Sequence, residues 1–296
     1  MKVKHSPLYY VYQVFNTVFL ALVSLTCILP ILHVFAMSLS DSNAALAGRV
    51  TFWPVQFSLS AYEYLIQKKD FFHSVSISAW RVLIGTLINM VLIVLTAYPL
   101  SRPATHFKAR KWYMLYFSIT MFIGGGLIPT YMIIKNLGLL DSFWVLILPG
   151  ALNIWNVIIM MNFIRGLPHA IEEAAFVDGA NHWQTLFKVV LPMSKPSIAS
   201  LLLFSMIGHW NAWFDGIFYM NNPNNYPMAT YLATQIISSN QNMTNMTREQ
   251  LALLSSLSEK TVRSAQLFIS IIPILVVYPF LQKYFVKGIT VGSVKE

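Results

Sequence analysis

Charged residues are scarce in this 296-residue chain. Asp, Glu, Lys and Arg make up only 10% of it, whereas hydrophobic residues make up 56%. Soluble domains usually contain about a quarter charged residues, so this composition excludes an ordinary soluble domain and predicts a membrane protein. The formal net charge is +9, but the basic residues are spread between apolar runs and form no basic stripe. We therefore expect contact with a lipid bilayer and no nucleic-acid partner.

The chain also lacks the motifs that carry chemistry in enzymes. Its single cysteine, Cys27, lies inside an apolar run, which excludes an internal disulfide. None of the 13 glycines is followed by Lys, so the GxxxxGKS/T phosphate-binding loop of an autonomous ATP site is absent. No HExxH, paired CxxC or nucleophile elbow occurs. We expect no catalytic residue and no cofactor or metal bound by this chain, which is therefore not expected to be an enzyme.

Long apolar runs are what the sequence has instead. Each of six runs is close to the roughly 20 residues that cross a bilayer core. The first follows a basic start but is far longer than the roughly 7–15 apolar residues of a secretory signal. The predicted fold is an all-α membrane protein with six transmembrane helices, namely Val11–Leu39, Val82–Leu100, Trp112–Ile134, Phe143–Ile164, Ile198–Phe214 and Leu267–Gln282.

The distribution of Lys and Arg predicts the orientation of these spans. Six spans place both termini on the same side. The segments on that side, 1–11, 101–111, 164–197 and 283–296, hold 12 basic residues in 70 positions. The segments on the opposite side hold 7 in 91 positions. Because cytoplasmic loops carry the excess of Lys and Arg, both termini are predicted to be cytoplasmic.

One polar segment stands out between the apolar runs. Glu172–Pro192 reads EEAAFVDGANHWQTLFKVVLP and has the pattern of two short helices joined by a hinge. Pro168 suits the first turn of the first helix. Gly179 fits the position after its end, where φ is positive. Asn181 with Gln184 predicts a capping box for the second helix, and the closing proline should end it. A polar helical hairpin between two spans indicates a docking element.

Two further local patterns carry structural predictions. Gly124–Gly126 with Pro129 lies inside the third predicted span. It indicates either a broken helix that lines a cavity, or a kink or close helix packing through small residues. The kink or close packing is the favoured interpretation. In the loop after the first span, Ser60 with Glu63 predicts a capping box that begins a short helix.

The spacing within the polar segment resembles the "EAA" loop of the membrane subunits of binding-protein-dependent ABC importers. The pattern matches throughout, although Val189 stands where the family usually has Ile. The resemblance implies an importer permease fold whose loop 168–192 docks in a cleft of a separate ATPase. The implied ATPase-coupling residues are Glu173, Ala174, Ala175, Asp178, Gly179, Leu191 and Pro192.

Two other stretches resemble the carbohydrate branch of this family, which includes the smaller maltose-type permease and lipoprotein-dependent oligosaccharide permeases. They are Ile128–Leu152 and Tyr284–Lys295, and the resemblance covers the chain from about Val75 to its end. It implies an N-terminal helix with its outer loop over 1–74, a permease core over 75–290 and a cytoplasmic tail over 291–296. The tail segment Gly288–Lys295 is expected to approach the ATPase dimer.

Family membership also implies a set of partners. These are a homologous second permease, two ATPase subunits that bind ATP and Mg, an external solute-binding protein and an oligosaccharide, in a bacterial cell membrane. The outer loop Asn221–Gln266 is either a surface for the binding protein or a solvated connector. The alternative function is a secondary, ion-coupled transporter of small polar solutes. For that function the chain lacks an obvious proton carrier, because the span cores hold no Asp deeper than Asp215.

The fourth and fifth spans contain amide, indole and carboxylate side chains that lipid does not favour. A sugar path needs such groups, because sugars present hydroxyls at their edges and C–H faces for stacking. The same Asn residues could instead form interhelical hydrogen bonds, and the Trp residues could mark the interface belt. The candidate substrate-path residues are Asn153, Asn156, Trp210, Asn211, Trp213 and Asp215.

Overall fold

A computed structural model describes residues 7–238 and 258–293 of the chain, and within those ranges the architecture is all-α. The described part contains no strand, only an isolated antiparallel bridge between Ser40 and Phe57. This confirms the predicted all-α class. The chain divides into two compact units, Met1–Lys69 with Ser238–Pro273, and Asp70–Ile237 with Ile274–Glu296.

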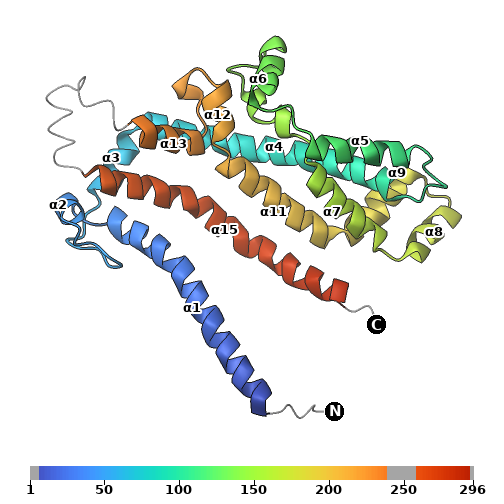
Figure 1. Ribbon diagram of the computed structural model, residues 1–296, viewed down its shortest axis with the longest axis horizontal. Coiled ribbons are helices and arrows are strands. Elements are labelled where there is room, and N and C mark those ends of the chain that lie inside the picture. The colour runs from blue at the N-terminus through green and yellow to red at the C-terminus, as the bar shows by residue number, and fades with distance from the viewer. Residues whose placement is uncertain (1–6, 239–257, 294–296) are drawn as a thin grey trace. The chain divides into compact units, whose positions relative to one another are not determined.

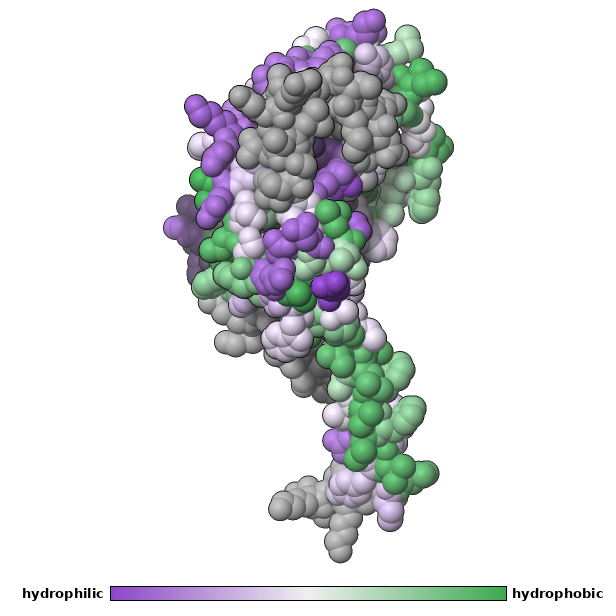
Figure 2. Space-filling view, turned by 90° about the vertical axis from the view of Figure 1, so that its left-hand side faces the viewer, coloured by the Kyte–Doolittle hydropathy of each residue, from purple (hydrophilic) through white to green (hydrophobic). Residues whose placement is uncertain are grey.

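The described part of the first unit comprises α1 Pro7–Ser38, α2 Ser42–Leu46, α3 Ser60–Gln67 and the start of α15 Glu259–Ser293 (Figure 1). Most side chains of α1 are exposed and apolar, as the green surface of this helix in Figure 2 shows. A continuously apolar, exposed helix of 32 residues needs lipid or protein around it.

The start of α3 differs from its predicted capping box. The residue that caps the helix is Leu59, and no side chain makes a capping hydrogen bond there. Ser60 already lies inside the first turn, and its hydroxyl is 2.9 Å from that of Ser58. The Ser60–Glu63 prediction was therefore wrong, because the hydroxyl found a partner on the preceding loop.

The second unit holds most of the remaining helices (Figure 1). In chain order they are α4 Lys69–Ser101, α5 Arg110–Phe122, α6 Leu127–Asn136, η1 Phe143–Leu146, η2 Leu148–Gly150, α7 Ile154–Arg165, α8 His169–Val177, α9 His182–Thr185, the π-helical turn η3 Leu186–Val190, α10 Leu191–Met193, α11 Lys195–Asn211, α12 Phe214–Tyr219, η4 Pro223–Asn225 and α13 Met228–Ser238. The main apolar core lies where α4, α7, η3 and α11 pack together, through residues such as Ile93, Met160, Val190 and Leu201.

Three described helices are long and apolar enough to cross a membrane by themselves, namely α1, α4 and Glu259–Phe280 of α15. Three bent helix pairs pass the same test together: α5 with α6, η1–η2 with α7, and α9–α10 with α11. If each pair is one span, the total reaches the predicted six.

The bends are where the predicted spans needed correction. The third span breaks between Phe122 and Leu127, and its two halves meet at 113°. Gly126 has a φ of 78°, which an L side chain adopts only with strain. The span is therefore broken and not merely kinked, so the favoured interpretation was wrong. Gly124–Gly126 line neither of the two cavities described below, so the predicted cavity beside the break stays a prediction. The fourth span begins as 3₁₀ turns, and the fifth ends as helix at Asn211, before the predicted Phe214.

Parts of two other predicted segments lie outside the described residues. In the outer loop Asn221–Gln266 the structure describes η4 and α13, whereas 239–257 lies outside the description. The predicted tail begins within α15, which continues to Ser293, and 294–296 lies outside.

Candidate functional site

The polar loop forms the predicted two helices. Gly179 has a φ of 81° and ends the first helix, as expected for a left-handed residue after a helix end. The backbone N–H of Gln184 donates to the Asn181 side chain at 2.9 Å, and the backbone N–H of Asn181 donates to Gln184 Oε1 at 2.9 Å. The capping box is therefore confirmed. Pro168 precedes α8 as its N-cap, one position before the predicted first turn.

The second helix does not end at Pro192. It continues from α9 through the π turn of η3 to Met193, and only at Ser194 does the chain bend by 81° into α11. Pro192 lacks a backbone N–H, so a regular helical ladder cannot pass through it. The π turn directly before it accommodates this interruption.

The predicted coupling residues divide into an exposed set and a packed set. Leu191 is half-buried against the main core, and Ala175 is also half-buried. Val177, at the tip between the two helices, is 86% exposed and apolar. The exposed members are Glu173, Ala174, Asp178, Gly179 and Pro192. The tip of the loop thus presents small, acidic and apolar groups away from the core, which is compatible with docking into another subunit. Their role in coupling stays a prediction.

Glu172 behaves differently from its exposed neighbour Glu173. It is only 7% exposed, and both its carboxylate oxygens accept hydrogen bonds from the guanidinium of Arg102, just after the end of α4. The same guanidinium lies 4.2 Å above the ring of Tyr98. This ion pair joins the coupling loop to α4.

A second polar feature is a cavity of about 230 Å³ inside the same unit. Its walls come from α4, η1, η2, the start of α7, α11 and α12. Apolar groups such as Val145 and Phe204 line part of it. The remaining wall is rich in hydrogen-bonding side chains: Arg81, Asn89, Asn153, Asn156, Ser205, His209 and Asp215.

Arg81 and Asp215 form a buried ion pair in the cavity wall. Nη1 of Arg81 donates to Asp215 Oδ1 at 3.2 Å and to the carbonyl of Ala212 at 3.1 Å, and Nη2 donates to Asp215 Oδ2. The side chain of Arg81 is 3% exposed and that of Asp215 is 23% exposed. The pair therefore anchors the break between α11 and α12 to α4.

His209 and Asn89 form a neighbouring polar contact. In the amide orientation that satisfies both its groups, Asn89 donates to the carbonyls of Ala151 and Gly85 and accepts from His209 Nε2 at 3.3 Å. The imidazole packs directly on Gly85, where an added Cβ would lie 2.6 Å from Nε2. The absence of a side chain at this glycine thus permits α4 and α11 to approach closely.

The cavity brings together half of the predicted substrate-path residues. Asn153, Asn156 and Asp215 line it, whereas Trp210, Asn211 and Trp213 do not. Trp210 is buried, and Asn211 and Trp213 are exposed. Sequence reasoning missed Arg81 and Asn89. The sequence could have indicated both, because each is a polar residue in or beside the apolar run that forms α4.

Comparisons with known proteins place the chain among similar sequences and structures. A family model described as "Binding-protein-dependent transport system inner membrane component" matches residues 2–291. The polygalacturonan/rhamnogalacturonan transport system permease protein YtcP of Bacillus subtilis (strain 168) is 38% identical over 277 residues, which are 94% of this chain and 96% of that protein. Protein LplC of the same strain is 38% identical over 286 residues, 96% of this chain and 95% of that protein.

A solved structure extends the similarity to the fold. It is the crystal structure of a bacterial ABC transporter involved in the import of the acidic polysaccharide alginate. One of its chains is 33% identical, with a TM-score of 0.85, and the match covers 95% of this chain and 99% of that one.

Proposed function

The chain belongs to the family of binding-protein-dependent transport system inner membrane components, and we propose that its cargo is oligosaccharides containing uronic acids. It is a membrane-spanning permease subunit of an ATP-driven importer. The names of relatives support the cargo class, since polygalacturonan is a polymer of a uronic acid and alginate is described as acidic.

The observation that carries this proposal is the polar cavity in the second unit. Amide groups such as those of Asn153 and Asn156 can both donate to and accept from sugar hydroxyls. Arg81 supplies a cation in the same wall, although Asp215 already pairs with it. A sugar carboxylate could use the Nε of Arg81, which is buried and has no hydrogen-bond partner among the described residues. The cavity thus offers partners for both hydroxyl and carboxylate groups.

The coupling to ATP is part of the proposal. Because the sequence has no phosphate-binding loop, hydrolysis takes place on two separate ATPase subunits, which bind ATP and Mg. The exposed tip of the loop, around Val177 and Gly179, docks on them from the cytoplasmic side. A homologous second permease completes the pathway, and an external solute-binding protein delivers the sugar. Both termini are cytoplasmic, in a bacterial cell membrane.

Uptake by cells that lack the chromosomal gene and carry it on a plasmid tests the cargo. We expect uptake of a radiolabelled galacturonate trimer and little uptake of an uncharged glucose trimer. Asn156→Leu should lower uptake of the acidic trimer about tenfold, since buried hydrogen-bond partners of the sugar are lost. Asn162→Leu is the matched control, because Asn162 is exposed on the same helix.

Two results would contradict the proposal. Equal uptake of the uncharged trimer would remove the uronic-acid requirement. Uptake that continues after ATP depletion and stops when ion gradients are dissipated would favour a secondary transporter.

A further inference from the structure

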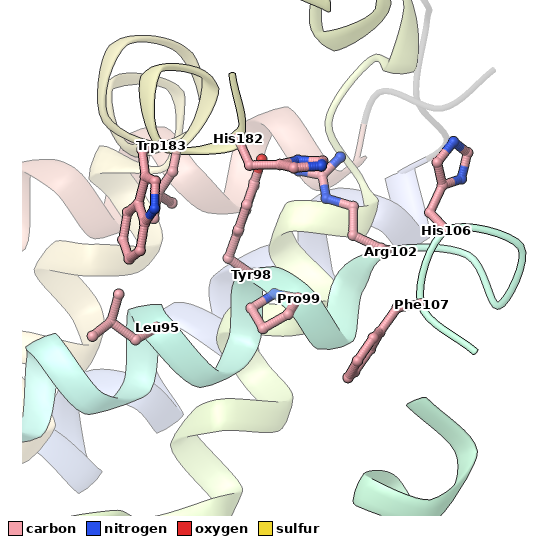
Figure 3. A pocket seen from close by; sticks show the side chains of 9 residues that line it. Leu95, Tyr98, Pro99, Arg102, His106, Phe107, His182 and Trp183 are labelled. Carbon is pink, nitrogen blue, oxygen red and sulfur yellow. The ribbon is translucent and has the colours of Figure 1, made fainter. Parts of the chain in front are cut away.

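A second cavity, of about 380 Å³, lies beside the coupling loop (Figure 3). It is formed by the last turns of α4, the loop after it, and the helix that begins at His182. Its volume is within the range of about 300–1,000 Å³ that is typical of small-molecule sites. None of its lining residues belongs to the polar cavity described above.

The two sides of this cavity differ in chemistry. Leu95 and Trp183 lie together on one side in Figure 3, whereas Arg102 and His106 lie on the other. Trp183 is 61% exposed, so the apolar side is open to the surroundings. A ligand that fits has an apolar part and a polar group that accepts hydrogen bonds.

Two buried groups in the wall have unused hydrogen-bonding capacity. Glu172 occupies the two terminal nitrogens of Arg102, but Nε of Arg102 is buried and makes no hydrogen bond with another described residue. The hydroxyl of Tyr98, whose residue is only 7% exposed, interacts with the neighbouring Arg102 side chain but donates to no acceptor among the described residues. Buried polar groups usually find a partner, so this pair indicates a missing acceptor.

The surrounding charge favours an anionic acceptor. Residues 102–111 contain Arg102, Lys108, Arg110 and Lys111 and no acidic residue. Both His106 and His182 line the cavity and can donate through a ring nitrogen. Glu172, which contacts the lining residue Arg102, is neutralised by the ion pair with it.

The position of the cavity selects the source of the anion. The membrane-spanning helix α4 ends at Ser101, so the residues that follow it lie at a membrane boundary. The excess of basic residues assigns this boundary to the cytoplasmic leaflet, whose anionic lipids attract basic segments next to a span.

We propose that this cavity binds an anionic phospholipid of the cytoplasmic leaflet. Its phosphate accepts hydrogen bonds from Tyr98, Arg102 and the histidines, and an acyl chain lies along the side of Leu95 and Trp183. The bound lipid then stabilises the packing of the loop helix that begins at His182 against α4. The binding site itself stands on the cavity, whereas its effect on coupling rests on the proposed function.

Native mass spectrometry of the purified full-length chain tests the lipid site. We expect one phosphatidylglycerol to bind at least tenfold more tightly than phosphatidylcholine. In the double variant Tyr98→Phe with His106→Leu this lipid should bind about tenfold more weakly, because two donors are lost while the tyrosine ring remains. The control variant is Tyr116→Phe with His73→Leu, in which both residues are exposed outside the cavity. It should bind like the wild type.

Three outcomes would overturn the proposal: equal binding of both lipids, unchanged binding in the double variant, or full competition by soluble glycerol 3-phosphate. The last would indicate a soluble phosphate ligand. Because binding is measured on the isolated chain, a failure here is distinguishable from a failure of sugar uptake, which is measured in cells.

Discussion

The ion pair between Arg102 and Glu172 makes a prediction that separates folding of the coupling loop from docking. Glu172→Ala removes the carboxylate and leaves the guanidinium of Arg102 mostly buried and unpaired. The two side chains are 14% and 9% exposed in the intact pair. The control is Glu173→Ala, one residue along the same helix, because Glu173 is exposed.

The magnitude follows from burial. Removing one partner of a fully buried ion pair costs about 3–5 kcal/mol. Because both groups retain some solvent contact and Arg102 keeps its contact with the Tyr98 ring, we expect about 2–3 kcal/mol. If this energy holds α8 in its folded state, losing it raises the population of locally open α8 about 30- to 150-fold.

Hydrogen exchange of the chain in lipid nanodiscs measures this directly. Peptides that cover His169–Val177 should exchange faster by that factor in Glu172→Ala and remain unchanged in Glu173→Ala. Co-purification of the ATPase should decrease in both variants, in Glu172→Ala because α8 is open more often and in Glu173→Ala because a docking group is missing. Equal exchange in Glu172→Ala and the wild type would refute the reasoning.

Three other variants test separate parts of the structure. Gly179→Val forces a β-branched residue to a φ of 81°. We therefore expect normal membrane insertion without co-purified ATPase. Normal recovery of the ATPase together with normal sugar uptake would contradict the assignment of Gly179 as the hinge. Gly85→Ala should destabilise the chain by about 1–3 kcal/mol, because the added Cβ clashes with the imidazole of His209. Gly208→Ala is the control and should leave the stability unchanged, because an added Cβ there meets no neighbouring group within 4 Å. Asp215→Asn should destabilise the chain by about 3 kcal/mol because Arg81 loses its charged partner, and thermal unfolding like that of the wild type would show that the pair is unimportant.

The sequence predicted well those features that depend on a few consecutive residues. The positive φ of Gly179 and the capping box of Asn181 with Gln184 depend on a short stretch, and both are present. The run of three glycines before Pro129 also indicated that the third span is interrupted. We favoured the kink because small residues permit close helix packing as well, and the pattern alone does not distinguish the two.

The features that escaped prediction depend on contacts between distant segments. Arg102 and Glu172 are 70 residues apart, and Arg81 and Asp215 are 134 apart. An acid in a polar loop and an arginine at the edge of a span each have an ordinary explanation when they are considered alone. Only the packing of the helices shows that the charges neutralise each other.

The most direct test of the central claim is affinity purification of the full-length chain from its native host, followed by mass spectrometry of the proteins that accompany it. The account predicts an ATPase with a phosphate-binding loop and a second six-span permease. In the Gly179→Val variant the permease should remain and the ATPase should disappear. Recovery of a homo-oligomer without any ATPase would contradict the account.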